Sequence, residues 1–150
     1  MTAVASEIDN LSVNITQEIH VRASLADTFA ALLEEMGPSN QGKPGTPMPM
    51  TLEPWPGGRW FRDLGDGNGH CWGHVQAIKR PTLLEISGPL MMSFAAVSNV
   101  QYRLKEVDGG MLITLRHTAL ALFPPDGFRD AVGHGWTMML DRIRRRGEKA

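Results

Sequence analysis

The chain has 150 residues, of which 42% are hydrophobic, and its formal net charge is -1 at pH 7. This size and apolar content suit one domain with a buried core, and the near-neutral charge argues against duplex nucleic acid as a partner. No apolar run approaches the roughly 20 residues of a membrane span, and the start of the chain lacks the basic and apolar regions of a signal peptide. The single cysteine, Cys71, cannot form an internal disulfide. From these three observations together, the cytoplasm is the expected location.

The beginning of the chain predicts an irregular segment followed by a strand. Residues 1–12 show no sustained pattern, and we expect them to form a flexible N-terminus ahead of a single domain over residues 13–147. From Val13 to Arg22, apolar and mostly β-branched residues alternate with polar ones, which predicts a half-buried strand. His20 lies on the polar side of this strand and is interpreted as an exposed histidine rather than a ligand.

A short amphipathic helix is expected directly after this strand. Ser24 precedes Asp27 by three residues in a capping-box-like arrangement, and apolar residues follow at helical spacing as far as Met36. Gly37 gives a suitable end for this helix. The stretch from 37 to 49, rich in Gly and Pro, then predicts a loop that serves either as a lid or as a plain connector.

Six further strands are expected between this loop and the end of the chain. Short turns containing Gly or Pro separate them, and these turns leave no room for crossover helices. Neighbouring strands are therefore antiparallel, and a doubly wound parallel sheet is excluded. The expected strands cover residues 50–54, 58–64, 70–79, 83–88, 99–107 and 111–122.

The longest helical pattern lies near the end of the chain and is the only one long enough to cover such a sheet. Apolar residues recur at helical spacing within residues 126–146. Gly133 and Gly135 each disfavour a helix interior by roughly 1 kcal/mol. The helix therefore starts either near Asp126 or, after a separate turn, near His134, unless a backbone passes close to the glycines.

A basic run from Arg142 to Lys149 lies at the end of this helix, which Gly147 is expected to terminate. Cations at this position compensate the helix dipole. The run is therefore interpreted as a solvated helix end, with a phosphate or lipid patch as the alternative.

The sequence shows no metal-binding or catalytic motif. On a strand, Cys71 points away from the face that His70 and His74 share, so these three side chains do not converge on one ion and no metal is expected. The GxSxG, CxxC and HExxH patterns are all absent. No cofactor is expected either.

Two polar residues, Tyr102 and His117, occupy inward positions of neighbouring predicted strands. Facing Trp136 and Met139 on the helix, they indicate a ligand cavity with a few polar groups, whereas a hydrogen-bonded core histidine is the alternative. The residues expected to line a ligand site are Trp60, Tyr102, Leu104, Leu115, His117, Trp136, Met139 and Leu140.

Several phrases resemble a known superfamily over nearly the whole chain. They include "PWPGGRW", "GHVQAIKRPTLLEISGPL", "VQYRLKEVDGGMLITLRHTAL" and "HGW". These phrases are similar to bacterial START-related proteins of the SRPBCC superfamily, and most of all to the branch homologous to the activator of the Hsp90 ATPase. The resemblance implies an α+β helix-grip fold (START/Bet v 1-like), in which a curved antiparallel sheet of six or seven strands wraps a long C-terminal helix. A short helix follows the first strand, and a cavity lies between sheet and long helix.

The resemblance leaves function open, because members of this superfamily bind lipids and polyketides, cyclise polyketides, perceive hormones or activate chaperones. We expect a protein that binds a small, largely hydrophobic molecule in the cavity. One alternative is an enzyme resembling polyketide cyclases and aromatases, with His117 or Tyr102 as acid or base. Another is an interaction domain that acts on a chaperone or as a homodimer.

Overall fold

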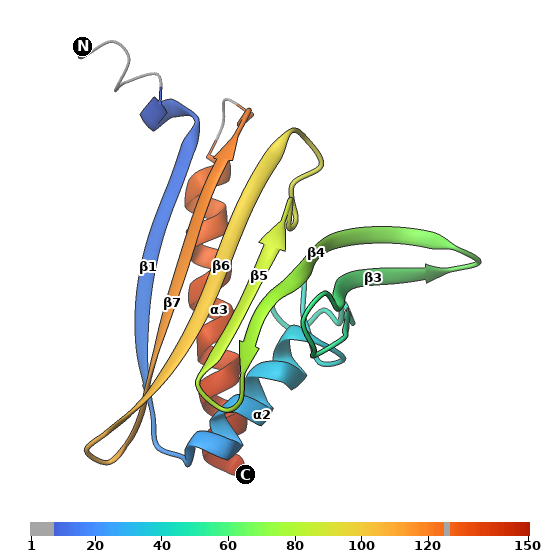
Figure 1. Cartoon of the computed structure of the whole chain (residues 1–150). Coiled ribbons are helices and arrows are strands. Elements are labelled where there is room, and N and C mark those ends of the chain that lie inside the picture. Colours follow the sequence, from blue (N-terminus) through green and yellow to red (C-terminus); the bar gives the residue numbers. More distant parts are fainter. Residues whose placement is uncertain (1–7, 125–126) are drawn as a thin grey trace.

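The computed structural model describes residues 8–124 and 127–150, and it contains one antiparallel sheet of seven strands packed against two helices (Figure 1). The predicted helix-grip fold is thereby confirmed. The elements are β1 (Ser12–Val21), α2 (Leu25–Met36), β2 (Thr51–Leu52), β3 (Arg59–Gly65), β4 (Asn68–Lys79), β5 (Leu83–Gly88), β6 (Ala96–Val107), β7 (Gly110–Ala121) and α3 (Phe128–Lys149).

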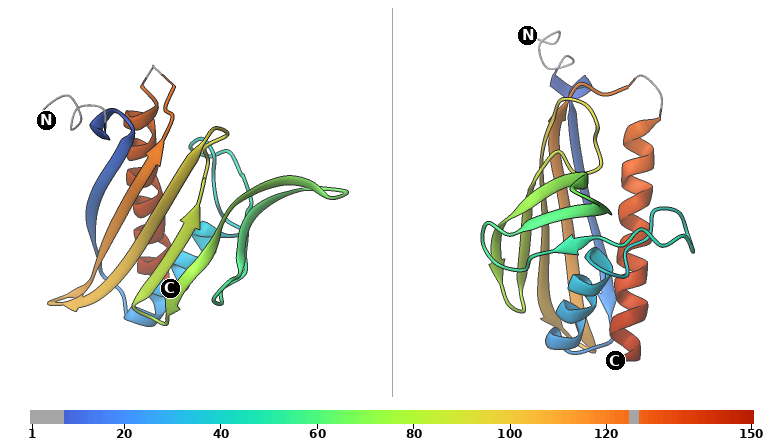
Figure 2. Two further views of the ribbon diagram at one scale, coloured as in Figure 1. Left: turned by 45° about the horizontal axis from the view of Figure 1, so that its top comes forward. Right: turned by 90° about the vertical axis from the view of Figure 1, so that its right-hand side faces the viewer.

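The strands follow the order β1-β7-β6-β5-β4-β3-β2, so the first and last strands of the chain are neighbours. β1 pairs with β7 over its whole length, from Ser12 opposite Leu120 to Val21 opposite Met111. This pairing places the start of α2 and the start of α3 at opposite ends of the sheet (Figure 1). Both helices pack on the same face of the sheet (Figure 2).

A β-bulge in β4 bends the β3–β4 hairpin away from the rest of the sheet (Figure 1). Trp60 lies opposite Gly73 and Phe61 lies opposite Cys71, so Trp72 is an extra residue on β4. Bulges increase the local twist and redirect a side chain. The ring of Trp72 consequently meets Trp60 edge-on, with ring centroids 5.1 Å apart.

Helix α3 is continuous across both of its inner glycines, which decides between the two expected starting points in favour of the earlier one. Gly127, with φ of 56°, is its N-cap, while Asp126 itself lies outside the described residues. A Cβ added at Gly135 would meet no atom within 4 Å, and the nearest atom to one at Gly133 would be Ile15 Cδ1 at 3.8 Å. Among residues 8–124 and 127–150, no backbone from outside the helix passes within 4 Å of either position.

The prediction that Gly147 ends this helix is wrong, because α3 continues to Lys149. Gly147 is buried where α3 meets α2: a Cβ there would lie 3.7 Å from Thr28 Cα and 3.8 Å from Ala31 Cβ. The glycine therefore serves close helix packing rather than helix termination.

At α2, the predicted cap is confirmed, since the Asp27 backbone N–H donates to Ser24 Oγ at 3.0 Å.

The two helices are joined by a buried carboxylate, Glu35 of α2, whose side chain is only 5% exposed. Arg142 Nε donates to Glu35 Oε1 at 3.0 Å, and Arg146 Nε donates to Glu35 Oε2 at 2.6 Å. Arg144 and Arg145 both pair with Asp141, at 2.7 and 2.9 Å. The basic run is thus more than a solvated helix end, because two of its arginines hold α3 against α2.

Candidate functional site

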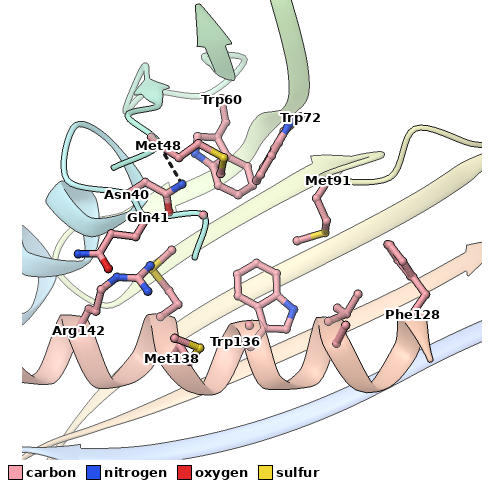
Figure 3. A pocket seen from close by; sticks show the side chains of 15 residues that line it. Asn40, Gln41, Met48, Trp60, Trp72, Met91, Phe128, Trp136, Met138 and Arg142 are labelled. Atoms are coloured by element: carbon pink, nitrogen blue, oxygen red, sulfur yellow. Dashed lines mark hydrogen bonds between the residues drawn. The ribbon is translucent and has the colours of Figure 1, made fainter. Parts of the chain in front are cut away.

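A pocket with a volume of about 370 Å³ lies between α3, the loop after α2, and the bent β3–β4 hairpin (Figure 3). This volume falls within the roughly 300 to 1,000 Å³ that is usual for small-molecule sites. The residues that line it are Asn40, Gln41, Gly42, Met48, Trp60, Trp72, Met91, Phe128, Ala131, Val132, Gly135, Trp136, Met138, Met139 and Arg142.

Helix α3 supplies one whole wall of the pocket. Its lining residues recur three or four positions apart, from Phe128 through Val132, Gly135 and Met139 to Arg142, and therefore lie on one stripe of the helix. Gly135 is exposed and has open space beside it, so the absence of a side chain there adds room to the pocket.

The pocket is apolar along most of its length and polar at one end. Asn40, Gln41 and Arg142 lie together at the polar end, while Met91 and Phe128 lie towards the other end (Figure 3). Asn40 is buried and its Nδ2 donates to the Met48 carbonyl at 3.1 Å, which fixes the loop that forms this end. The polar side chains of the pocket are thus gathered at one end, and apolar side chains line the rest.

Trp60, Trp136 and Met139, which the sequence predicted as lining residues, all border the pocket. The Trp60 side chain is 1% exposed, and its indole Nε1 donates to the Met36 carbonyl at 2.7 Å. The strand position of Trp60 is therefore inward. Whether these residues contact a ligand stays a prediction.

The other predicted residues are buried in the core and are not among those that line the pocket. Tyr102 packs edge-on against Trp136, with ring centroids 6.4 Å apart, and its hydroxyl donates to Met36 Sδ at 3.2 Å. Burial raises the pKa of Tyr102 well above its usual value, and the positive charge of Arg142 opposes this shift only in part. The remaining members of this group are Leu104, Leu115, His117 and Leu140.

His117 is fully buried and uses both ring nitrogens in internal hydrogen bonds. The indole Nε1 of Trp136 donates to His117 Nδ1 at 3.0 Å. Because an indole N–H can only donate, the proton of the neutral ring is on Nε2, which donates to Ser98 Oγ at 3.1 Å. Burial lowers the pKa of His117 to about 4, so the imidazole is neutral at neutral pH.

This geometry makes His117 a positioning residue for the pocket. It holds the indole of Trp136 from behind, with ring centroids 5.6 Å apart, while the same indole borders the pocket. Ser98 on β6 in turn fixes the imidazole. A chain of two hydrogen bonds thus connects Ser98 to the indole that borders the pocket.

Apart from Trp60, sequence reasoning missed the residues that complete the pocket outside α3. Met48, Asn40 and Gln41 belong to the loop that was expected as a lid or connector, and this loop folds over α3. Trp72 was missed because the bulge disrupts the alternation of β4. Met91 lies in the connection between β5 and β6, where no periodic pattern marks a direction.

Within residues 8–124 and 127–150, no helix is long and apolar enough to cross a membrane. The same part of the chain holds no group of three or more His, Cys, Asp or Glu side chains placed to bind a metal ion.

Comparisons with solved structures give the same fold at low sequence identity. A protein from Rhizobium leguminosarum has a TM-score of 0.70 and 17% identity, with 93% of this chain and 96% of that chain covered. The di-domain ARO/CYC StfQ from the steffimycin biosynthetic pathway has a TM-score of 0.66 and 13% identity. The match covers 97% of this chain but only 53% of StfQ, so this chain spans about half of that protein. CalU16 from Micromonospora echinospora has a TM-score of 0.58 and 22% identity, with coverages of 89% and 71%.

A search of curated proteins gives no significant match. A family model, in contrast, matches most of the chain: the model for "Activator of Hsp90 ATPase homolog 1-like protein" covers residues 23–148. This match extends from the start of α2 almost to the end of α3, and it agrees with the resemblance in the sequence. The chain therefore belongs to the family of Activator of Hsp90 ATPase homolog 1-like proteins.

Proposed function

We propose that this protein binds a small, largely apolar molecule in the pocket between α3 and the β3–β4 hairpin. The observation that carries the proposal is the character of the pocket, an apolar hollow of about 370 Å³ with three polar side chains gathered at one end. Small-molecule sites typically combine apolar walls with a few placed polar groups in this way.

The walls combine fixed and adaptable side chains. Trp60 and Trp136 are held by hydrogen bonds from behind, to Met36 and His117 respectively. Rigid aromatic walls of this kind reduce the entropy that is lost on binding. Four methionines adapt more easily to the shape of a ligand; they are Met48, Met91, Met138 and Met139.

The placement of the two candidate acid–base groups favours binding over a polyketide cyclase or aromatase reaction. Tyr102 and His117 both lie behind the residues that line the pocket. Both nitrogens of His117 already have partners, and its lowered pKa is poorly matched to proton transfer near neutral pH. A pocket used for binding needs neither group to reach the ligand.

Filling the pocket at Gly135 is expected to abolish binding without weakening the fold. In Gly135→Leu the new side chain enters open space on the pocket stripe, and loss of a helical glycine raises stability by roughly 0.5 to 1 kcal/mol. Thermal shifts with a panel of alkanols and polycyclic phenols measure the effect. A bound ligand at about 100 times its Kd stabilises the wild type by about 2.7 kcal/mol, and this gain should be absent from the variant.

His134→Leu is the matched control, because His134 is exposed on the same helix and does not border the pocket. This variant should keep the ligand-induced shift of the wild type. Native mass spectrometry of the freshly purified protein adds a direct search for a retained molecule. A wild type that retains nothing and shifts with no member of the panel would overturn the proposed function.

A further inference from the structure

The polar end of the pocket borders a second hollow, and this second hollow is basic. It has a volume of about 560 Å³ and shares two wall residues with the apolar pocket, Gln41 and Arg142. The rest of its lining includes Arg145, Arg146 and Lys149 of α3. An apolar hollow and a cationic hollow thus meet at one guanidinium group.

The acidic side chain in the basic hollow does not neutralise it. Glu35 is the common partner of Arg142 and Arg146, so one negative charge faces two positive charges. Lys149 adds a further positive charge to the same wall. Since Glu35 is nearly fully buried, its interaction with the arginines is screened less by water than a surface pair would be.

Arg142 has a donor that is poorly satisfied at the boundary between the two hollows. Its Nε binds Glu35, whereas its Nη2 donates to Met139 Sδ at 3.5 Å. A thioether sulfur is a weak acceptor, and Met139 borders the apolar pocket. An anionic oxygen at this point would accept a much stronger, charge-assisted hydrogen bond from the guanidinium.

We propose that the ligand is an apolar molecule with a single carboxylate, whose apolar part lies along α3 towards Phe128 and whose carboxylate contacts Arg142. This inference rests on the proposed function and adds the chemical class of the ligand. A single carboxylate matches the boundary between the hollows, because Arg142 is the one charged residue that lines both of them. Gln41, on the shared wall, contributes an uncharged polar side chain beside the carboxylate.

The first test compares three probes by calorimetry and thermal shift on the whole chain. Decanoate carries both features of the proposed ligand, 1-decanol carries only the apolar chain, and acetate carries only the carboxylate. We expect decanoate to bind at least about tenfold more tightly than 1-decanol, as one charge-assisted hydrogen bond would give. Acetate alone should produce no shift. Added salt should weaken decanoate binding and leave 1-decanol binding unchanged.

The second test places a negative charge at the boundary without disturbing the ion pairs of Glu35. In Gln41→Glu the side chain keeps its shape and the oxygen that accepts from the Gly45 N–H, a bond of 3.0 Å in the wild type. Decanoate affinity should fall about tenfold relative to 1-decanol affinity, so that the preference for decanoate over 1-decanol is lost. Gln101→Glu makes the same change on β6, away from both hollows, and should alter neither affinity.

The outcomes separate this inference from the proposed function. Equal affinities for decanoate and 1-decanol would overturn the inference that the ligand carries a carboxylate. The proposed binding function would remain. A shift with acetate as large as that with decanoate would also overturn it, because the basic hollow would then be an independent anion site. Unchanged decanoate affinity in Gln41→Glu would do the same. Failure of every probe, including the wider panel, would overturn the proposed function itself.

Discussion

Glu35→Gln is expected to lower the free energy of unfolding by about 3 kcal/mol, the lower end of what removing one partner of a buried ion pair costs. The Arg142 side chain is only 16% exposed and would lose its charged partner. Arg146, at 44% exposure, can turn towards water, which keeps the loss from being larger. Equilibrium unfolding in urea measures the change, and the melting temperature should fall by about 9 °C.

Glu18→Gln is the matched control for this experiment. Glu18 is exposed on β1, and the same loss of charge there should change stability by no more than about 0.5 kcal/mol. If Glu35→Gln were as stable as this control, the pairs between α2 and α3 would not contribute to holding the helices together.

Stability is also expected to fall by about 3 kcal/mol as the pH drops from 6.5 to 4, because of His117. Burial lowers the pKa of His117 from 6.5 to about 4 in the folded state. Well above pH 6.5 the imidazole is neutral in both states, and the full stability is present. Between these values the unfolded chain binds a proton that the folded protein does not, so stability decreases as the pH falls. Each pKa unit of difference corresponds to about 1.4 kcal/mol.

His117→Gln should remove this pH dependence. The variant should lose about 1 to 3 kcal/mol at pH 7, because hydrogen bonds to Ser98 and Trp136 are disturbed, but its stability should be nearly flat between pH 6.5 and 4. His20→Gln, at an exposed position, should keep the slope of the wild type. A variant at position 117 with the wild-type slope would assign the pH dependence to other groups.

The ion pair of Arg59 and Glu53 acts at lower pH than His117. The side-chain hydrogen bond from Arg59 lowers the pKa of Glu53 to about 2. The stability that this pair contributes is therefore present above pH 4.5 and lost as the pH falls towards 2. The difference between wild type and His117→Gln in urea midpoints, measured at intervals from pH 7 to pH 4, therefore isolates the contribution of His117.

The fold was predictable because the apolar periodicity, the capping residues and the turn residues all indicate the same helices and strands. The pattern at Leu83–Gly88 has the same bounds as β5, and the capping signal at Ser24 marks the true start of α2. Alternation along β7 correctly placed His117 on the inner face. These features depend on neighbours in the sequence, which a periodic pattern records directly.

The pocket was less predictable because it depends on contacts between distant residues. The pairing of Glu35 with Arg142 joins two helices that are far apart in the sequence, and no periodicity records it. The bulge at Trp72 reverses the side of the strand on which this residue lies, so alternation fails there. The loop that carries Gln41 has no period at all, and its position over α3 follows from tertiary packing.

The tryptophans give this protein an optical signal for the state of its pocket. Three of the four, Trp60, Trp72 and Trp136, border the pocket, whereas Trp55 is 54% exposed at a turn. Emission from these three buried or half-buried indoles should therefore dominate the blue side of the fluorescence spectrum. It should respond when a bound molecule displaces water beside them. Trp55→Phe would remove most of the background from solvent-exposed indole. Binding of an unlabelled, colourless compound could then be followed directly, in real time, from the intrinsic emission of the protein.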